Sequence, residues 1–380
     1  MSRESYDWLC DALEVYKPRQ SEFGRLNVTG TVMSKRKILK LVKEGHIRDW
    51  DDPRLYTLIA LRRRGVPPGA IISFISTLGV STATTTIQVT RLEQSIRQYL
   101  ETSVPRLLMV LRPLKVTIEN LDEDYFSTVE KPLHPRVPEL GTSEVPFTRT
   151  IYIESEDFRL EDSKDYFRLA PGKTVGLFGA PYPITCTSCK TDPATGTVVE
   201  VIARLENSGK AKKPKTYIQW VAEHTPSGSP IRIEETRIFH QLFKSDNPAA
   251  SPDYLADINP DSLEVVKGAL VETGFLTLAK KLWKDAVAES KARTEKALKE
   301  SETGARGTGD DDTPRVTSDQ LVGKECLRFQ GLRVAYFAVD KDSKLKFLEE
   351  ADDVVPTLAE GDSIILNRIV SLKEDAGKTA

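Results

Sequence analysis

Basic residues gather in one short segment, "SKRKILKLVKEG" (34–45). Its cations are Lys35, Arg36, Lys37, Lys40 and Lys43. Ser34 and Gly45 fit the N-cap and the C-terminal stop of a helix, so three of these cations fall in its first turn. A helix N-terminus carries partial positive charge and normally favours acidic side chains. The segment therefore indicates a phosphate site, in which loop amides, the helix N-terminus and lysines face one anion.

A solvated helical face is the alternative interpretation. Between residues 35 and 64 the chain has ten basic and four acidic residues, whereas the whole chain has a net charge of −2. Charge runs of this kind usually lie in solvent. No G-x-x-x-x-G-K-[ST] sequence is present, which excludes a P-loop. On the residues alone, both interpretations stay open.

Cys186 and Cys189, in "CTSC", have the spacing of half a zinc site. Cys10, Cys326 and the four histidines provide no second pair at metal spacing. We therefore expect ordinary strand cysteines and no structural metal. Four cysteines in 380 residues also argue against a disulfide framework and favour a reducing compartment.

The overall composition is that of a soluble globular protein, with 39% hydrophobic and 29% charged residues. No apolar run approaches ~18 residues, and the N-terminal "MSRESYDWLC" lacks the apolar region of a secretory signal. The near-neutral net charge predicts no polyanionic partner by itself. We expect a cytoplasmic protein of two or three domains that binds neither DNA nor a membrane.

Helices must position the cations of residues 35–64. Besides the helix at 34–45, the sequence predicts helices at 52–65, 67–79 and 89–101. The helix at 52–65 has Asp52 at its N-cap, Pro53 at N1 and Gly65 as its stop. The Ser/Thr-rich "VSTATTTIQ" (80–88) predicts a loop between the last two helices.

After Pro105 the sequence predicts short strands, rich in β-branched and aromatic residues and separated by turn residues. The runs are "LKVTIENL" (114–121), "TRTIYIES" (148–155), "VVEVIARLE" (198–206), "KTYIQWVAE" (215–223), "IRIEETRIF" (231–239), "RVAYFAVD" (333–340) and "SIILNRIVSL" (363–372). Such a pattern over so many residues predicts two barrels. Residues 284–324 differ: we expect them to form a mostly mobile, low-complexity surface insertion between strands, and their first half fits a helix.

The segment "TVMSKRKI" (31–38) resembles the second signature of class I aminoacyl-tRNA synthetases, in the Val-Met-Ser-Lys-Arg form of the glutamyl and glutaminyl enzymes. Its flanks, "EFGRLNVTGTVMSKRKILKLV" (22–42) and "RDWDDPRLYTLIALRRRGVPP" (48–68), and the final "IVSLKEDAGK" (369–378) resemble the eukaryotic glutaminyl enzymes. The resemblance covers nearly the whole chain except the insertion. It favours the phosphate site over the solvated face.

This resemblance implies an α+β multidomain fold. Residues 1–104 are expected to hold the end of a class I catalytic domain, with the Val-Met-Ser-Lys-Arg loop and a helical subdomain that meets the tRNA stem. Residues 105–380 are expected to form two antiparallel β-barrels of the ribosomal-L25-like anticodon-binding type, with the insertion at about 284–324. The implied reaction attaches glutamine to tRNA(Gln) through glutaminyl-adenylate. ATP with Mg²⁺, glutamine and tRNA(Gln) are the implied partners, and a monomer is the default expectation.

The resemblance also assigns residues to the nucleotide and the amino acid. The implied ATP-binding residues are Arg25, Leu26, Met33, Ser34 and Lys35. Lys35 is the implied catalytic residue, because a fixed ammonium lowers the barrier by stabilising charge that develops on the phosphates. Arg36 and Lys37 fit either a structural or a tRNA role. Gln20 matches the amino-acid pocket, where an amide partner discriminates glutamine from glutamate.

Further residues are implied in tRNA recognition, where splayed bases are stacked and hydrogen-bonded. The anticodon set is Arg106, Arg168, Gln330 and Arg333, and the set facing the inner side of the tRNA is Ser81, Thr84, Thr85 and Gln88. Gly176 and Phe178 stand where the family often has a cation for the first anticodon base, and Phe178 can stack instead.

The chain departs from the family pattern at its start. The nucleotide-binding fold with a His-Ile-Gly-His-type motif is not found before Tyr6. We therefore expect the C-terminal part of a longer enzyme, inactive by itself. A non-catalytic tRNA-binding module and the closely related glutamyl enzyme are the alternatives.

Overall fold

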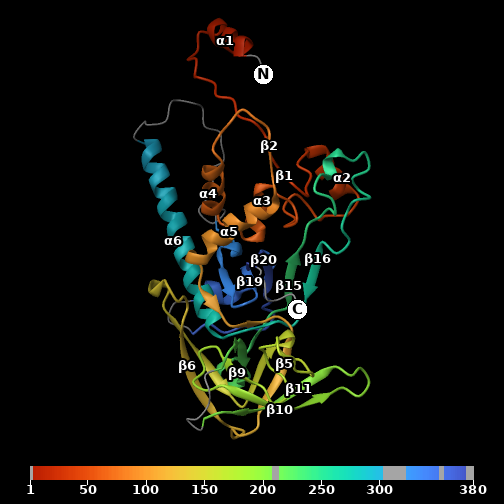
Figure 1. Ribbon diagram of the computed structural model, residues 1–380. Coiled ribbons are helices and arrows are strands. Elements are labelled where there is room, and N and C mark those ends of the chain that lie inside the picture. The colour runs from red at the N-terminus through yellow and green to blue at the C-terminus, as the bar shows by residue number, and fades with distance from the viewer. Residues whose placement is uncertain (1–2, 208–213, 303–321, 351–354, 374–380) are drawn as a thin grey trace.

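The computed structural model describes residues 3–207, 214–302, 322–350 and 355–373. Figure 1 shows an elongated molecule. Helix α1 (Arg3–Ala12) lies at one end, away from the other elements. A group of helices follows, and the strands form the centre and the opposite end. Residues 351–354 and 374–380, with most of the "KEDAGK" end of the family resemblance, lie outside the described residues.

The helical region contains α2 (Lys35–Lys43), α3 (Leu58–Arg64), α4 (Pro68–Leu78) and α5 (Val89–Ser103). Phe74 of α4 and Leu92 and Ile96 of α5 share a core with Tyr336 and Ile369, which come from the strands. The helices therefore pack directly on the strand region. This confirms the helices predicted at 34–45, 67–79 and 89–101.

The predicted start of the helix at 52–65 is wrong. Asp52 does not cap it; its carboxylate accepts hydrogen bonds from the Arg54 side chain and from the amides of Arg48 and Arg54. The helix begins at Leu58, with Thr57 Oγ1 accepting from the amide of Ala60. An Asx-type turn has taken the carboxylate that the sequence assigned to the cap.

The predicted loop at 80–88 is also partly wrong. Strand β2 (Thr85–Ile87) pairs in parallel with β1 (Leu26–Val28), in the register Leu26 to Thr85. Gly24 comes so close to this segment that an added Cβ would lie 2.0 Å from the carbonyl oxygen of Ala83. Only glycine permits this approach.

One seven-stranded sheet fills the end of the molecule opposite α1 (Figure 1). In spatial order its strands are β12 (Tyr217–Ile218), β9 (Thr174–Leu177), β10 (Ile184–Thr191), β11 (Val198–Leu205), β5 (Pro113–Ile118), β8 (Thr150–Glu154) and β13 (Trp220–Ala222). The edge strands β12 and β13 are separated in the chain by Gln219 alone. The sheet therefore curls until its edges meet, giving a near-barrel around Trp220 and Phe147.

A second sheet lies between this near-barrel and the helices. Its order is β16 (Leu263–Val266), β15 (Glu235–Phe239), β20 (Ile365–Ser371), β19 (Ala335–Val339), β18 (Arg328–Gly331) and β3 (Arg106–Leu107). A three-stranded sheet of β14 (Ile231–Arg232), β17 (Leu270–Val271) and β4 (Met109–Val110) shares its core. A hairpin of β6 (Phe126–Pro132) and β7 (Thr142–Thr148) completes the strands described.

The prediction of purely antiparallel sheets is wrong. Strand β11 pairs in parallel with β5, and β12 with β9, in the seven-stranded sheet. In the six-stranded sheet β15–β20 and β18–β3 are parallel pairs. Each parallel pair joins strands that are far apart in sequence, so local turn signals could not reveal it.

Helix α6 (Gly274–Glu302) confirms the helix predicted for the first half of the insertion. Residues 303–321, the core of the predicted insertion, lie outside the described residues. Short 3₁₀ turns occur at Pro138–Leu140, Ser155–Asp157, Thr225–Ser227, Pro248–Ala250, Lys324–Cys326 and Lys346–Glu349. Among the helices described, none combines the length and apolar character needed to cross a membrane.

Candidate nucleotide and RNA sites

The loop before α2 is held in place by a hydrogen bond and by hydrophobic contacts with residues of the strand region. The amide of Gly30 donates to the carbonyl of Asp246 over 2.8 Å. Val32, Ile38 and Leu41 are buried in one cluster with Phe243 and Tyr254. Ser34 occupies the N-cap position in an extended conformation, but its side chain makes no capping hydrogen bond. The loop is therefore rigidly placed, and its hydroxyl is available to a ligand.

The cations of this segment have different environments. Lys35 is exposed and makes no hydrogen bond or ion pair within the described residues. Lys37 donates to the carbonyl of Ala249 over 2.8 Å, and its Nζ lies 4.8 Å from the ring centroid of Tyr254. Lys37 is thus held by the fold, whereas Lys35 is free to meet an anion.

Arg63 and Arg64 of the cluster are used internally. Arg63 is 7% exposed and pairs with Asp340 over 3.0 Å and with Asp51 over 3.2 Å. Arg64 donates to the carbonyl of Ile369. The local excess of positive charge is therefore not one open cationic surface. The open part is the start of α2.

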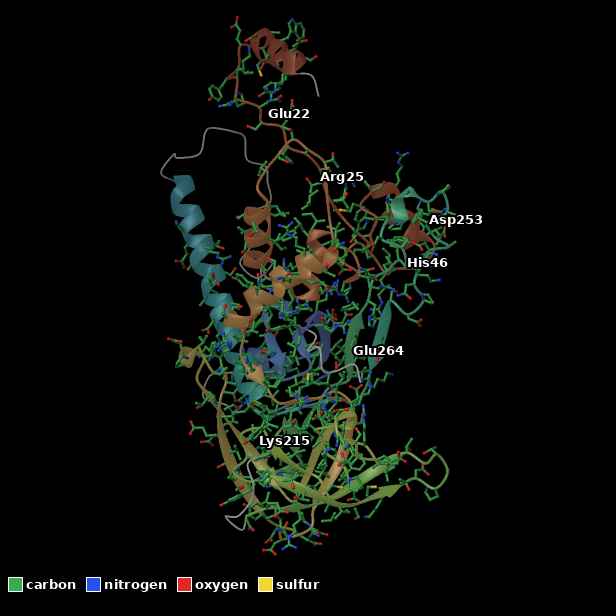
Figure 2. The ribbon with its side chains drawn as sticks, in the orientation of Figure 1. Glu22, Arg25, His46, Lys215, Asp253 and Glu264 are labelled. Carbon is green, nitrogen blue, oxygen red and sulfur yellow. The ribbon has the colours of Figure 1, made fainter. Side chains whose placement is uncertain are left out.

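Two small cavities flank this start. One of about 440 Å³ is lined by Arg25, Met33 and Ser34 of the predicted ATP set, with Thr86 and Asp246 among the other residues. The second, of about 330 Å³, lies beside Met33 and Lys35 and has a mostly apolar wall that includes Trp50. Figure 2 shows Arg25 on the β1 side of the helical region, close to where the chain turns toward α1.

A larger cavity of about 950 Å³ lies along the β1–β2 pair. Arg25 and Leu26 line it, and so do Ser81, Thr85 and Gln88 from the predicted tRNA set. The parallel pairing thus brings part of the predicted ATP segment next to part of the predicted tRNA segment. Thr84 is exposed but does not line this cavity.

Gln20 lies apart from the cavities at the start of α2 and along the β1–β2 pair. It is half-buried in the extended segment between α1 and β1 and lines none of the cavities described above. The structure therefore places no other member of the site beside it.

The predicted anticodon residues fall into two pairs. Arg106 of β3 and Gln330 of β18 stand opposite each other in the parallel register. Within the described residues, Arg106 Nε and Gln330 Oε1 are buried without a hydrogen-bond partner. The backbone of Arg106 is held by Lys131, whose Nζ donates to its carbonyl over 2.9 Å. Lys131 also pairs with the buried Glu272 over 3.1 Å.

Arg168 and Arg333 meet at one carboxylate. Each lies 3.2 Å from Asp157 Oδ1, and Arg333 also donates to the carbonyl of Tyr217 over 2.9 Å. Arg333 has a φ of +59°, a region that non-glycine residues rarely adopt. Both arginines line a cavity of about 460 Å³, together with Arg112, Glu154 and Gln219. The carboxylate fixes two planar donor groups at the wall of one cavity.

The acids of this cavity are shifted by burial. Burial raises the pKa of Glu154 to about 7, although the amides of Leu111 and Arg112 donate to its carboxylate and oppose the shift. Burial likewise raises the pKa of Asp157, and Arg333 and Arg168 counteract it. Sequence reasoning missed Asp157, because "ESEDF" (154–158) is a short acidic run of the kind that usually lies in solvent.

Gly176 lies in β9 and Phe178 directly follows it, next to the edge strand β12 of the seven-stranded sheet. The ring of Tyr217 covers Gly176 so closely that an added Cβ would lie 2.4 Å from its Cδ1. Phe178 is 41% exposed. In β10, Cys186 is buried and Cys189 half-buried, and both thiols are free. Over the part of the chain that is described, no three His, Cys, Asp or Glu side chains are grouped as metal ligands.

Comparison with known families assigns most of the chain. Residues 1–102 match the family described as "tRNA synthetases class I (E and Q), catalytic domain". Residues 104–206 and 217–298 match two families, each described as "tRNA synthetases class I (E and Q), anti-codon binding domain". The second of these begins at Tyr217, the first residue of β12.

Curated proteins align with the whole chain. The "Probable glutamine--tRNA ligase" of Schizosaccharomyces pombe is 46% identical over 381 residues, covering 100% of this chain and 42% of that protein. The "Glutamine--tRNA ligase" of Saccharomyces cerevisiae is 45% identical, covering 100% and 43%. The "Glutamine--tRNA ligase protein virJ" of Hypocrea virens is 45% identical, covering 100% and 51%. The chain thus spans about two fifths to one half of the length of these relatives.

Proposed function

Because the chain belongs to the class I tRNA synthetases for glutamate and glutamine, we propose that it supplies the ATP-closing loop and the anticodon-binding region of a glutamine--tRNA ligase. The reaction joins glutamine to tRNA(Gln) in two steps, through glutaminyl-adenylate. The alignment of the entire chain with relatives named glutamine--tRNA ligases supports glutamine over glutamate as the amino acid.

The convergence of Arg168 and Arg333 on Asp157 carries the anticodon part of this proposal. These arginines are 165 positions apart in the chain, and they come from different parts of the strand region. A guanidinium presents donors in a fixed plane, which suits the acceptor edge of an unpaired base. Arg106 and Gln330 provide a second pair of polar groups on adjacent strands. We assign these four residues to the unpaired bases of the anticodon loop.

The start of α2 carries the nucleotide part. Lys35 is an exposed ammonium at a helix N-terminus, where the first-turn amides also face outward. An attacking glutamine carboxylate increases the negative charge on the α-phosphate and the leaving pyrophosphate. Lys35 stabilises that charge, while Met33, Ser34, Arg25 and Leu26 position the nucleotide. Mg²⁺ accompanies the ATP, and Gln20 belongs to the amino-acid pocket.

The remaining assignments follow from the family. We propose that residues 1–104 form the end of the catalytic domain, and that Ser81, Thr84, Thr85 and Gln88 face the inner side of the tRNA. Residues 105–380 form two barrels of the ribosomal-L25-like type. The near-closure of the seven-stranded sheet supports the first of these barrels. The four free thiols support a reducing compartment, for which we propose the cytoplasm.

Two measurements on the purified chain test the proposal. The first is binding of a tRNA(Gln) transcript at several salt concentrations; we expect affinity that falls steeply as salt rises, since phosphate contacts dominate. Replacing Arg168 by Ala should reduce discrimination among anticodon variants more than it reduces binding of unrelated tRNA. If tRNA binding is absent, or does not depend on the anticodon, the anticodon assignment is wrong.

The second is ATP–pyrophosphate exchange in the presence of glutamine or glutamate. Glutamine-dependent exchange that is lost on Lys35→Ala supports a ligase whose site includes this loop. Exchange with glutamate alone favours the glutamyl enzyme. Anticodon-dependent tRNA binding without any exchange supports the anticodon assignment, and it is the result expected if this chain is one part of a longer enzyme.

A further inference from the structure

The segment that closes the seven-stranded sheet carries side chains with no assigned role. Strand β12 ends at Ile218 and β13 begins at Trp220, so the near-barrel closes around Gln219. We call residues 215–220 the closing segment. It has Lys215, Tyr217 and Gln219 at alternate positions. Figure 2 shows Lys215 on the seven-stranded sheet, at the end of the molecule opposite α1.

Gln219 is a buried residue at the wall of a cavity. Its side chain is 2% exposed, and within the described residues its Oε1 has no hydrogen-bond partner. A buried amide oxygen without a partner is unfavourable, so natural folds rarely keep one without a reason. The cavity of about 460 Å³ that Gln219 lines also holds Arg168 and Arg333.

Gln219 adds a neutral amide to a cavity whose other polar side chains are arginines and the acids Glu154, Glu156 and Asp157. The guanidinium groups of Arg168 and Arg333 can only donate hydrogen bonds. The edge of a nucleobase presents donors as well as acceptors. Gln219 Oε1 is a neutral acceptor at the same wall, so it can receive an N–H of a base whose acceptor atoms face the arginines.

Tyr217, two residues before Gln219, offers an exposed aromatic ring on the same segment. Its side chain is 41% exposed, and its ring packs over Gly176, where any side chain would displace it. Its carbonyl oxygen accepts from Arg333 Nη1 over 2.9 Å, which ties the tyrosine backbone to the cavity wall. Two residues earlier, Lys215 Nζ lies 5.5 Å from the ring centroid of Phe167, which is 48% exposed. Exposed aromatic rings interleaved with cations are typical of surfaces that bind single-stranded nucleic acid.

We propose that the closing segment is a base-recognition strand: Gln219 is a specificity-determining residue that hydrogen-bonds one unpaired base in the cavity of Arg168 and Arg333, and Tyr217 stacks on a neighbouring unpaired base of the same loop. The inference rests on the proposed anticodon function and adds two residues to it. Asp157 acts through the arginines and is a positioning residue of the same cavity.

Synthetic RNA stem-loops provide the test. They carry the anticodon stem and loop of tRNA(Gln), with each of the four bases placed in turn at each anticodon position. Binding to the full chain is measured by fluorescence anisotropy at one fixed salt concentration. Tyr217→Ala should weaken binding of every stem-loop by about tenfold, since stacking tolerates any base, and Tyr217→Phe should restore it.

Gln219→Leu should behave differently. Affinity for stem-loops with one preferred base at one position should fall about fivefold, and affinity for the other three bases there should change little. Gln219→Met is measured beside it, because it removes the amide and keeps an unbranched side chain. Controls are Tyr16→Ala, an 87% exposed tyrosine outside the sheets, and Thr236→Val, a fully buried hydroxyl oxygen without a partner in β15. Thermal unfolding of each variant checks that it is folded.

The outcomes separate this inference from the proposed function. A wild-type chain that binds all stem-loops alike, or none, refutes the anticodon assignment and this inference together. A wild-type chain that discriminates anticodons, with folded Gln219 variants that discriminate equally well, refutes the role of Gln219 alone. A Tyr217→Ala variant that binds like Tyr16→Ala refutes stacking.

Discussion

The cationic start of α2 and the arginine cavity of the seven-stranded sheet are both positively charged, yet they are built in opposite ways. Lys35 is exposed, flexible and without a partner in the described residues. Arg168 and Arg333 are about a quarter exposed, and both are tied to Asp157, which is itself 3% exposed. A point charge on a flexible stem suits phosphates whose charge changes during a reaction. A planar donor group held in one orientation suits the edge of a base, because bases differ in the positions and directions of their hydrogen-bonding groups.

The difference also separates the two regions energetically. The strand region contains buried ion pairs, and removing one partner of such a pair leaves an uncompensated charge. The free cation at α2 makes no comparable contribution. Stability should therefore depend on the charges of the strand region and be nearly indifferent to Lys35.

The largest effect is expected for Lys131→Met. Lys131 and Glu272 are 4% and 1% exposed, so the variant leaves a buried carboxylate without its cation. We expect a loss of roughly 3–5 kcal/mol in the free energy of unfolding, measured with guanidinium chloride. Lys35→Met, the matched control from α2, should lose less than about 0.5 kcal/mol. The double variant Lys131→Met with Glu272→Gln should recover most of the loss. If Lys131→Met is as stable as wild type, the proposed difference between the strand region and α2 is wrong.

Asp157→Asn should have the next largest effect. It replaces the carboxylate that Arg168 and Arg333 share by a neutral amide. We therefore expect a loss of about 2 kcal/mol in the free energy of unfolding, measured with urea. Both arginines should also become mobile, which reduces discrimination among anticodon stem-loops. A variant that is destabilised but discriminates normally would show that Asp157 supports only the fold.

Glu154→Gln should alter the pH dependence of stability. The pKa of Glu154 is raised by burial from 4.5 to about 7, so the folded protein binds a proton that the unfolded chain releases. This contribution is fully present below the unfolded pKa and is lost as the pH rises through about 7. Wild type should lose at most about 2 kcal/mol from this group between about pH 5 and pH 8, because the side chain is partly exposed. Urea midpoints across that range should show a flatter profile for the variant; parallel profiles argue against the shift.

The smallest effect distinguishes two neighbouring lysines of α2. Lys37→Ala loses a hydrogen bond to Ala249 and a cation–π contact with Tyr254, so we expect a loss of about 1 kcal/mol in thermal or urea unfolding. Lys35→Ala should be within about 0.5 kcal/mol of wild type. If the two variants are equally stable, the contacts of Lys37 do not stabilise the fold, and Lys37 does not differ from Lys35 in this respect.

Local signals predicted the elements well and their partners poorly. Gly65 and Gly79 correctly marked helix ends, because helix stops depend on neighbouring residues. The start of α3 was misplaced because the sequence offers two possible cap residues five positions apart: Asp52 accepts from Arg54, and Thr57 caps the helix at Ala60. Strand β2 was missed because its partner β1 lies 59 residues earlier in the chain. A three-residue strand has too little pattern of its own to be recognised.

The site follows the same rule. Family resemblance found Arg168 and Arg333 one at a time, but nothing in the sequence joins them to Asp157, which is 176 residues from Arg333. Gln219 has no sequence signal, since a glutamine within a strand run gives no indication of burial. Only the closure of the sheet puts it at a cavity.

The position of β20 within the six-stranded sheet sets the order in which the chain can be completed. Strand β20 lies between β15 and β19, both of which leave the ribosome before it. Until β20 arrives, two strand edges that are buried in the finished sheet stay open. The nascent chain therefore carries an unpaired β15 edge while residues 240–371 are translated, and this sheet closes only after translation has passed Ser371.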